Sequence, residues 1–292
     1  MPLFPLLLQI LFLALVTSEG PYLVILAERR REREGLMQVT GNTILITGGG
    51  RGIGRGLAEA FHAEGNQVII AGRGKKALEE TVSANPGMKA AVVDMSDGDS
   101  IARLAEQMKR DYPALNVVIL NAGIMRTESV QSGGLDNAEA IVATNLLGPI
   151  RLTAALLPML LSKSRAAIMT VSSGLAFVPL AVTPTYCATK AAIHSYTQSL
   201  RYQLQHTSVD VLELVPPYVQ TELLGPGQLT DPNALPLKDF ISEVMHILKH
   251  SPEATEICVE RVKPLRRAEA SGNYDTFYKA FNDRAASAHE TL

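Results

Sequence analysis

Short apolar runs alternate with longer amphipathic stretches along the chain from Thr43 onward. The apolar runs are five to eight residues long and nearly continuous, which is typical of strands buried on both faces of a parallel sheet. They lie at residues 43–47, 67–71, 89–94, 116–121, 166–173 and 209–216. The stretches between them predict helices over 53–65, 75–84, 98–111, 135–161 and 185–206. This rhythm predicts an α/β fold, a doubly wound parallel sheet in a single domain.

The pattern changes after Pro216. The stretch "PPYVQTELLGPGQLTDPNALPL" is rich in proline and glycine and predicts a long loop. A helix near 237–250 and a helical tail are expected to follow it.

The N-terminal 36 residues form a separate segment with an open role. An apolar run over 3–16 and a second one over 22–27 are followed by four arginines between 29 and 33. A membrane span needs about 20 apolar residues, and joining the two runs would enclose a glutamate and a proline. Three interpretations remain: a membrane anchor, a dispensable extension before a domain starting at Met37, or a cleaved signal.

These alternatives determine the predicted domains and location. Residues 1–36 are expected to be the extension, with possible membrane contact through 1–27, and residues 37–292 the domain. If the extension is inserted, arginines on its C-terminal side favour a cytoplasmic main domain. The alternative is a soluble cytoplasmic protein.

Composition excludes several function classes. The chain has 292 residues, a net charge of −2 and a pI near 6.3, which disfavours nucleic-acid binding. Cys187 and Cys258 are 71 residues apart and outside any Cys/His cluster, so two buried thiols are expected rather than a disulfide or a zinc site. No metal site is predicted.

A glycine-rich turn follows the first predicted strand. The stretch "LITGGGRGIG" places five glycines between Gly48 and Gly54, with the spacing TGxxxGxG from Thr47. In a Rossmann fold, such a strand–helix turn brings backbone N–H groups to a pyrophosphate at a helix N-terminus. The expected cofactor-binding residues of this turn are Thr47, Gly48, Arg51, Gly52, Ile53 and Gly54.

Basic residues near this turn favour NADP(H) over NAD(H). No acid follows the second predicted strand before Glu79, although an acid there would bind the ribose of NAD. Instead Arg73 is present, and with Arg51 it offers two guanidinium groups for a 2′-phosphate. The alternative is an ordinary solvated basic turn.

Tyr186 and Lys190 in "TYCATK" are four residues apart on a predicted helix, and therefore lie on one face. A nearby ammonium and a cationic nicotinamide would lower the tyrosine pKa and make Tyr186 a general acid or base near neutral pH. The alternative is a tyrosine–lysine pair without a role. His194, one turn further, is expected to be a helix-face histidine.

Together with "LNAG" at 120–123 and "VSSG" at 171–174, these motifs resemble the short-chain dehydrogenase/reductase family over residues 38–220. Two departures resemble its DltE-type branch: Pro216-Pro217 replaces the usual Pro-Gly, and "TEICVERVKPLRRAEA" replaces the usual C-terminal motif. The resemblance implies a catalytic tetrad of Asn145, Ser173, Tyr186 and Lys190. It implies further cofactor contacts from Asp94, Asn121, Ala122, Gly123, Tyr186, Lys190, Val219 and Thr221.

The predicted function is hydride transfer between NADP(H) and a small-molecule carbonyl or alcohol. An apolar substrate is expected from Leu175, Phe177, Leu180, Val182, Leu223 and Leu224. Two alternatives are a non-catalytic NADP(H)-binding regulatory protein and a membrane-tethered interaction protein. The resemblance and the long apolar helices predicted at 135–161 and 185–206 also imply a homodimer or homotetramer.

Overall fold

The first strand, β1 (Thr43–Thr47), lies inside the sheet because its Ile44, Leu45 and Ile46 are completely buried. In the computed structural model, which describes residues 36–133 and 135–290, seven parallel strands are ordered β3-β2-β1-β4-β5-β6-β7. The other strands are β2 (Gln67–Gly72), β3 (Lys89–Val92), β4 (Val117–Leu120), β5 (Ala166–Val171), β6 (Val209–Val215) and β7 (Glu256–Cys258). The predicted doubly wound sheet in a single domain is confirmed.

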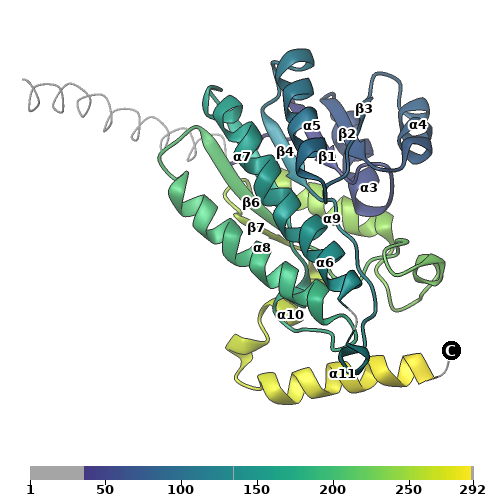
Figure 1. Cartoon of the computed structure of the whole chain (residues 1–292). Helices are drawn as coiled ribbons and strands as arrows, with labels where there is room; N and C mark the ends of the chain where they lie inside the picture. Colours follow the sequence, from purple (N-terminus) through teal and green to yellow (C-terminus); the bar gives the residue numbers. More distant parts are fainter. Residues whose placement is uncertain (1–35, 134, 291–292) are drawn as a thin grey trace, which may run out of the picture.

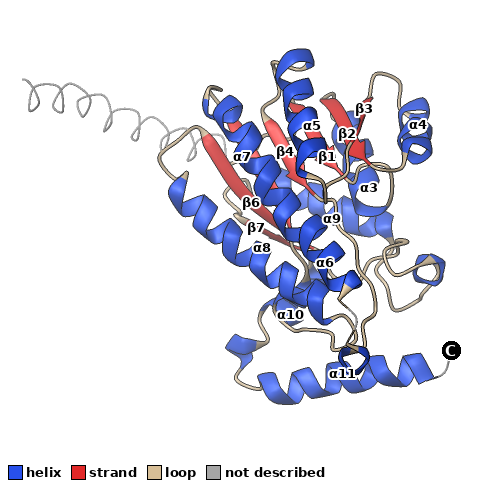
Figure 2. Ribbon diagram, viewed as in Figure 1, coloured by secondary structure: helices blue, strands red, loops and turns tan. Residues whose placement is uncertain are grey.

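Helices cover both faces of this sheet (Figures 1 and 2). The principal helices are α3 (Gly52–Ala63), α4 (Lys75–Ala84), α5 (Gly98–Asp111), α6 (Asp136–Val142), α7 (Gly148–Leu161), α8 (Pro184–Gln203), α9 (Leu237–His250), α10 (Lys263–Arg266) and α11 (Tyr274–Glu290). One apolar layer contains Phe61 of α3 and Phe240 of α9, and the other contains Met108 of α5, Leu156 of α7 and Leu200 of α8. The crossover order reverses between β1 and β4, where ligands bind such sheets.

Two elements differ from the expectation. The helix predicted over 135–161 is divided into α6, a π-helical turn at Ala143–Leu147 and α7. Strand β7 was not predicted, because a three-residue strand containing Glu256 has too little apolar periodicity to be recognised.

The stretch Asp136–Leu161 is long and apolar enough to cross a membrane, with a mean hydropathy of 1.6. Its apolar side chains include Ile141, Leu152, Leu156 and Leu160, all completely buried against the rest of the domain. Packing within the domain therefore explains the part of this apolar composition that lies on the buried face. The predicted membrane contact through residues 1–27 lies outside the described residues.

Candidate active site

The turn between β1 and α3 exposes bare backbone. Gly48 and Gly52 have φ angles of +69° and +50°, which favour glycine. A Cβ added to Gly54 would lie 2.3 Å from the Gly48 carbonyl oxygen, so the helix can approach the turn only with glycine there. Arg51 is the N-cap residue of α3 and makes no side-chain capping bond, which leaves the first helical N–H groups available to an anion.

Thr47 joins the ends of the two neighbouring strands at the point where the crossover order reverses. Its Oγ1 accepts hydrogen bonds from the backbone N–H groups of Asn121 and Ala122, each at 3.1 Å. The Asn121 Nδ2 in turn donates to the Thr47 carbonyl at 2.9 Å. Thr47 is therefore a buried support of the turn, and Gly48, Asn121 and Ala122 line the cleft beside it.

Arg51 and Arg73 both line this cleft, as expected for residues that bind one ligand. Arg51 forms a hydrogen-bonded ion pair with Glu222. The hydrogen bond and the negative charge of Glu222 both raise the pKa of the Arg51 guanidinium. Asp94 has a local role: its Oδ1 accepts hydrogen bonds from the backbone N–H and hydroxyl of Ser96, which lower its pKa. Asp94 is not among the residues found to line the cleft in the described chain.

The cleft has a volume of about 500 Å³, within the range of small-molecule sites. It runs from the glycine-rich turn to Tyr186 and Lys190, so the structure brings together motifs that are more than 130 residues apart. Among the predicted residues it is lined by Gly48, Arg51, Gly52, Ile53, Gly54, Arg73, Asn121, Ala122, Gly123, Tyr186, Lys190, Thr221 and Leu223. Sequence reasoning missed Met125, Arg126 and Glu222, which line it from irregular loops.

Tyr186 lies in the first turn of α8, with its hydroxyl hydrogen-bonded to Ser173 after β5. Ser173 also accepts a hydrogen bond from the Leu175 backbone at 3.1 Å, which orients its hydroxyl. Burial raises the Tyr186 pKa well above its usual range, while the Ser173 hydrogen bond lowers it by less. In the protein without cofactor, loss of hydration thus outweighs the neighbouring polar groups. The predicted lowering requires the cationic nicotinamide as well and stays a prediction.

Lys190 lies one turn after Tyr186 and is also buried. Its Nζ donates to the Val171 carbonyl at 2.7 Å and lies 5.5 Å from the centroid of the Tyr186 ring. Burial lowers the Lys190 pKa to about 8, and the charge of Glu213 opposes this change. Near neutral pH the Lys190 amine is thus mostly protonated, and the resulting ammonium lies close to the tyrosine ring.

Asn145 lies on the π-helical turn behind the cleft. Its side chain makes two hydrogen bonds with the backbone of Ile124, each at 2.8 Å. A Cβ added at Gly123 would lie 3.4 Å from Asn145 Oδ1 and 3.8 Å from Lys190 Nζ. Asn145 and Lys190 therefore lie beside the loop that follows β4.

The loop after β6 approaches the glycine-rich turn. A Cβ added at Gly52 would lie 3.3 Å from Thr221 Cγ2. Val219 is buried, forms a bridge with Leu235 and accepts a hydrogen bond from Gln228 Nε2 at 2.7 Å. Thr221 thus lines the cleft, whereas Val219 supports the loop from behind.

The apolar residues expected at the substrate end have different positions. Leu175 and Leu180 pack with Met125 and Tyr186 in a small apolar cluster. Phe177 instead contacts the ring of His194 and the guanidinium of Arg266, with ring-centre distances of 4.7 and 4.6 Å. The two thiols are free, and Cys187 is buried as expected while Cys258 is only partly buried.

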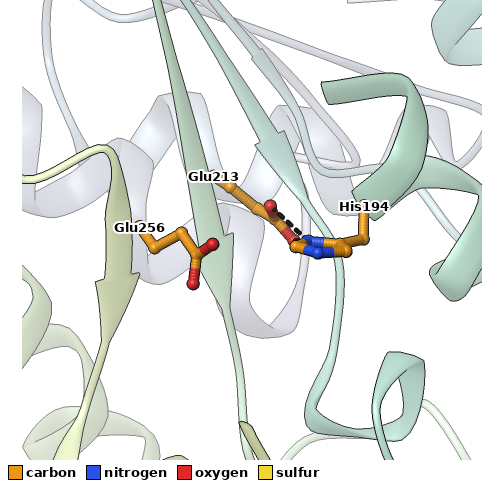
Figure 3. Close-up of side chains that lie close together, drawn as sticks. All are labelled: His194, Glu213 and Glu256. Atoms are coloured by element: carbon orange, nitrogen blue, oxygen red, sulfur yellow. Dashed lines mark hydrogen bonds and ion pairs between the residues drawn. The ribbon is translucent and has the colours of Figure 1, made fainter. Parts of the chain in front are cut away.

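A second group of ionisable side chains lies beside α8 (Figure 3). His194 Nδ1 is 2.8 Å from Glu213 Oε2, and donor atoms of His194, Glu213 and Glu256 lie within 4.8 Å of one another. Although this spacing suits a metal ion, both Glu256 oxygens accept hydrogen bonds from Arg266, at 2.7 and 3.0 Å. A cation would have to displace this guanidinium, so we assign the group as an ion-pair cluster.

Known proteins share both the sequence and the fold. Residues 42–230 match the family described as short chain dehydrogenase. The "Uncharacterized oxidoreductase DltE" of Bacillus subtilis (strain 168) is 40% identical over 253 residues, which cover 84% of this chain and 98% of that protein.

Two solved structures extend this similarity. A short chain dehydrogenase from Burkholderia cenocepacia J2315 in complex with NADP has a TM-score of 0.68 and 25% identity, over 85% of this chain and 98% of that one. A short chain dehydrogenase/reductase from Burkholderia phymatum in complex with NAD has a TM-score of 0.71, over 82% and 96% of the two chains; at 18% identity it shows the fold alone. The chain therefore belongs to the short-chain dehydrogenase/reductase family of oxidoreductases, in its DltE-type branch.

Proposed function

We propose that the protein transfers hydride between NADP(H) and an apolar carbonyl or alcohol, with Tyr186 as the general acid/base. The observation that carries this proposal is the position of Tyr186 and Lys190 on the wall of the same cleft as the glycine-rich turn. The bare backbone of Gly48, Gly52 and Gly54, together with the uncapped start of α3, fits the phosphates of a dinucleotide.

Each residue of the tetrad has a distinct task in this proposal. When bound, NADPH supplies the hydride. Tyr186, kept protonated by its raised pKa, donates a proton to the substrate oxygen, and Ser173 orients the tyrosine hydroxyl. Lys190 supplies a positive charge near the tyrosine ring and binds the nicotinamide ribose. Asn145 holds the loop after β4 in place through the backbone of Ile124.

The preference for NADP(H) is supported by two guanidinium groups on the cleft. Arg51 and Arg73 would bind the 2′-phosphate, each by charge-assisted hydrogen bonds. The relative from Burkholderia cenocepacia is bound to NADP, and the one from Burkholderia phymatum is bound to NAD. For this chain the assignment therefore rests on its own arginines. Asp94, whose carboxylate is engaged by Ser96, is the remaining candidate for the adenine side.

An apolar substrate is supported by the side chains near Tyr186. Met125, Leu175 and Leu180 pack around the tyrosine, and Leu223 lines the cleft from the loop after β6. The predicted homodimer or homotetramer stays a prediction, supported by exposed Leu147, Leu161 and Tyr202 on the two long helical stretches. Light scattering of the purified protein would measure the assembly.

NADPH oxidation against a panel of aldehydes, ketones and quinones tests the proposed function. The 37–292 fragment and the full chain are compared, with NADH in parallel. Turnover that prefers NADPH and falls about 100-fold or more in Tyr186→Phe is the expected result. Turnover that persists in Tyr186→Phe would contradict the role of the tyrosine. NADPH binding by a folded protein without any turnover would favour a regulatory NADP(H)-binding protein instead.

A further inference from the structure

The two carboxylates of the ion-pair cluster beside α8 come from neighbouring strands in register. Thr170 of β5 lies directly beside Glu213 of β6, and Glu213 lies beside Glu256 of β7. Side chains at paired positions of neighbouring strands point to the same face of a sheet. Here that face is covered by α8, because Thr170 Oγ1 lies 2.7 Å from Thr197 Oγ1 and Glu213 contacts His194 of the same helix.

Glu213 has an unfavourable position for a carboxylate unless it has charged partners. It is completely buried, and Glu256 on the next strand is a like charge. His194 of α8 contacts it, and the charge of Glu213 also acts on three cations from two helices: Lys190 and Arg201 on α8, and Arg266 on α10. Arg266 is held by Glu256, and Arg201 donates to the carbonyls of Val211 and Thr255.

Strand pairing places Glu213 in the part of the sheet that Lys190 contacts. Lys190 Nζ donates to the carbonyl of Val171, which directly follows the strand neighbour of Glu213. Lys190 and His194 are one helical turn apart, so both project from α8 toward this part of the sheet. Burial disfavours the charged form of Lys190 and so lowers its pKa. The negative charge of Glu213 favours the charged form and so raises the lysine pKa.

We infer that Glu213, oriented by His194, is a positioning residue that keeps the buried Lys190 in its ammonium form. The inference rests on the proposed function, in which Lys190 acts as a cation beside Tyr186. Phe177 contacts both His194 and Arg266 beside the cluster, and Glu213 itself is completely buried. Burial strengthens the interaction of Glu213 with a neighbouring charge, because the effective dielectric constant is lower away from water.

Titration of Lys190 by ¹³C NMR tests the inference directly. The full chain is labelled with ¹³C-lysine, and the Lys190 Cε resonance is assigned by its loss in Lys190→Arg. The wild-type midpoint is expected near 8. In Glu213→Gln, which keeps the size and the hydrogen bond to His194, the midpoint is expected to fall by about one pH unit, so that the ratio of neutral to charged Lys190 rises about tenfold at constant pH.

Glu256→Gln is the matched control, because it removes a carboxylate of the same cluster that has its own guanidinium partner. It is expected to leave the Lys190 midpoint within about 0.1 pH unit of wild type. A folded Glu213→Gln protein with an unchanged Lys190 midpoint overturns the inference. So does an equal fall in both variants, since it would show a general effect of losing charge from the cluster.

If Glu213→Gln does not fold, Glu213→Asp decides. This variant keeps the charge but withdraws it from α8 by one methylene, and a fall of a few tenths of a unit is expected; an unchanged midpoint overturns the inference. The titration uses neither cofactor nor substrate. Its result is therefore separate from the turnover of Tyr186→Phe, which tests the proposed function.

Discussion

Asn145 binds both backbone polar groups of Ile124: its Oδ1 accepts from the Ile124 N–H at 2.8 Å, and its Nδ2 donates to the Ile124 carbonyl at 2.8 Å. Asn145 is only 1% exposed and lies in the π-helical turn between α6 and α7. The pair therefore connects an irregular part of a long helix to the loop that follows β4. Gly123, a predicted cofactor contact, directly precedes Ile124 in that loop.

Asn145→Ala is expected to destabilise the protein by about 2–3 kcal/mol, because it leaves two backbone groups of Ile124 without partners in a partly buried site. Urea unfolding measures this change. Asn137→Ala is the matched control, since Asn137 on α6 accepts a hydrogen bond from the exposed guanidinium of Arg126, at 2.8 Å. Its effect is expected within about 0.5 kcal/mol. Equal losses in the two variants would contradict the bracing role of Asn145.

Gly54→Ala is expected to disrupt the glycine-rich turn. The added Cβ would lie 2.3 Å from the Gly48 carbonyl oxygen and 2.4 Å from Asn121 Nδ2, so the turn and α3 must separate. We expect a loss of about 1–3 kcal/mol in stability and weaker NADPH binding, measured by thermal unfolding and cofactor fluorescence. Gly227→Ala, where a Cβ has no neighbour within 4 Å, is expected to change neither. Normal NADPH affinity in Gly54→Ala would argue against phosphate binding at this turn.

Arg51→Ala and Arg73→Ala are each expected to weaken NADPH binding about tenfold, since a hydrogen bond to a charged group contributes roughly 1.5–3 kcal/mol. NADH binding should stay unchanged, because NADH lacks the 2′-phosphate. Glu222→Gln frees Arg51 from its ion pair and is expected to tighten NADPH binding a few-fold. Fluorescence titrations measure all three.

Lys76→Ala is the control for these arginines, because Lys76 is a neighbouring exposed cation that faces Glu80. If it weakens NADPH binding as much as the arginine variants do, a diffuse basic surface and not a phosphate site selects the cofactor.

Lys190→Met is expected to remove activity and to stabilise the protein. Burial lowers the Lys190 pKa from 10.5 to about 8, so the unfolded chain binds one more proton than the folded one between these values. The free energy of unfolding of the wild type therefore rises with pH across this window. Below the window, burial of the charged lysine lowers the free energy of unfolding by up to about 3 kcal/mol. At pH 7 we expect Lys190→Met to raise the free energy of unfolding by about 1–3 kcal/mol. This gain is smaller than the full cost of burying the charge, because Glu213 loses a partner.

Chemical unfolding at pH 7 and pH 10 checks this expectation. The advantage of Lys190→Met should shrink as the pH rises, and Lys109→Met on the exposed side of α5 should show no such trend. A variant less stable than wild type at pH 7 would show that contacts of the lysine outweigh the cost of burying its charge.

Much of the fold could be predicted because parallel strands covered on both faces leave continuous apolar runs. Strand β1 is an example, since each of its central residues is completely buried. The division of the helix at Asn145 could not be predicted, because it depends on a hydrogen-bonded partner 21 residues away. The three-residue β7 was missed for a similar reason: it is stabilised by pairing with β6 and not by a local pattern.

For the candidate site, the sequence by itself predicted which residues carry the chemistry. The glycines of the strand–helix turn, a tyrosine and a lysine one helical turn apart, and two arginines with no acid directly after the second strand are local features, because each depends on residue type and short spacing. Only the tertiary structure decided their surroundings. Burial raises the Tyr186 pKa in the protein without cofactor, and strand register places Glu213 in the part of the sheet that Lys190 contacts. Both effects depend on which distant segments exclude water from a charge, and sequence spacing alone does not specify that.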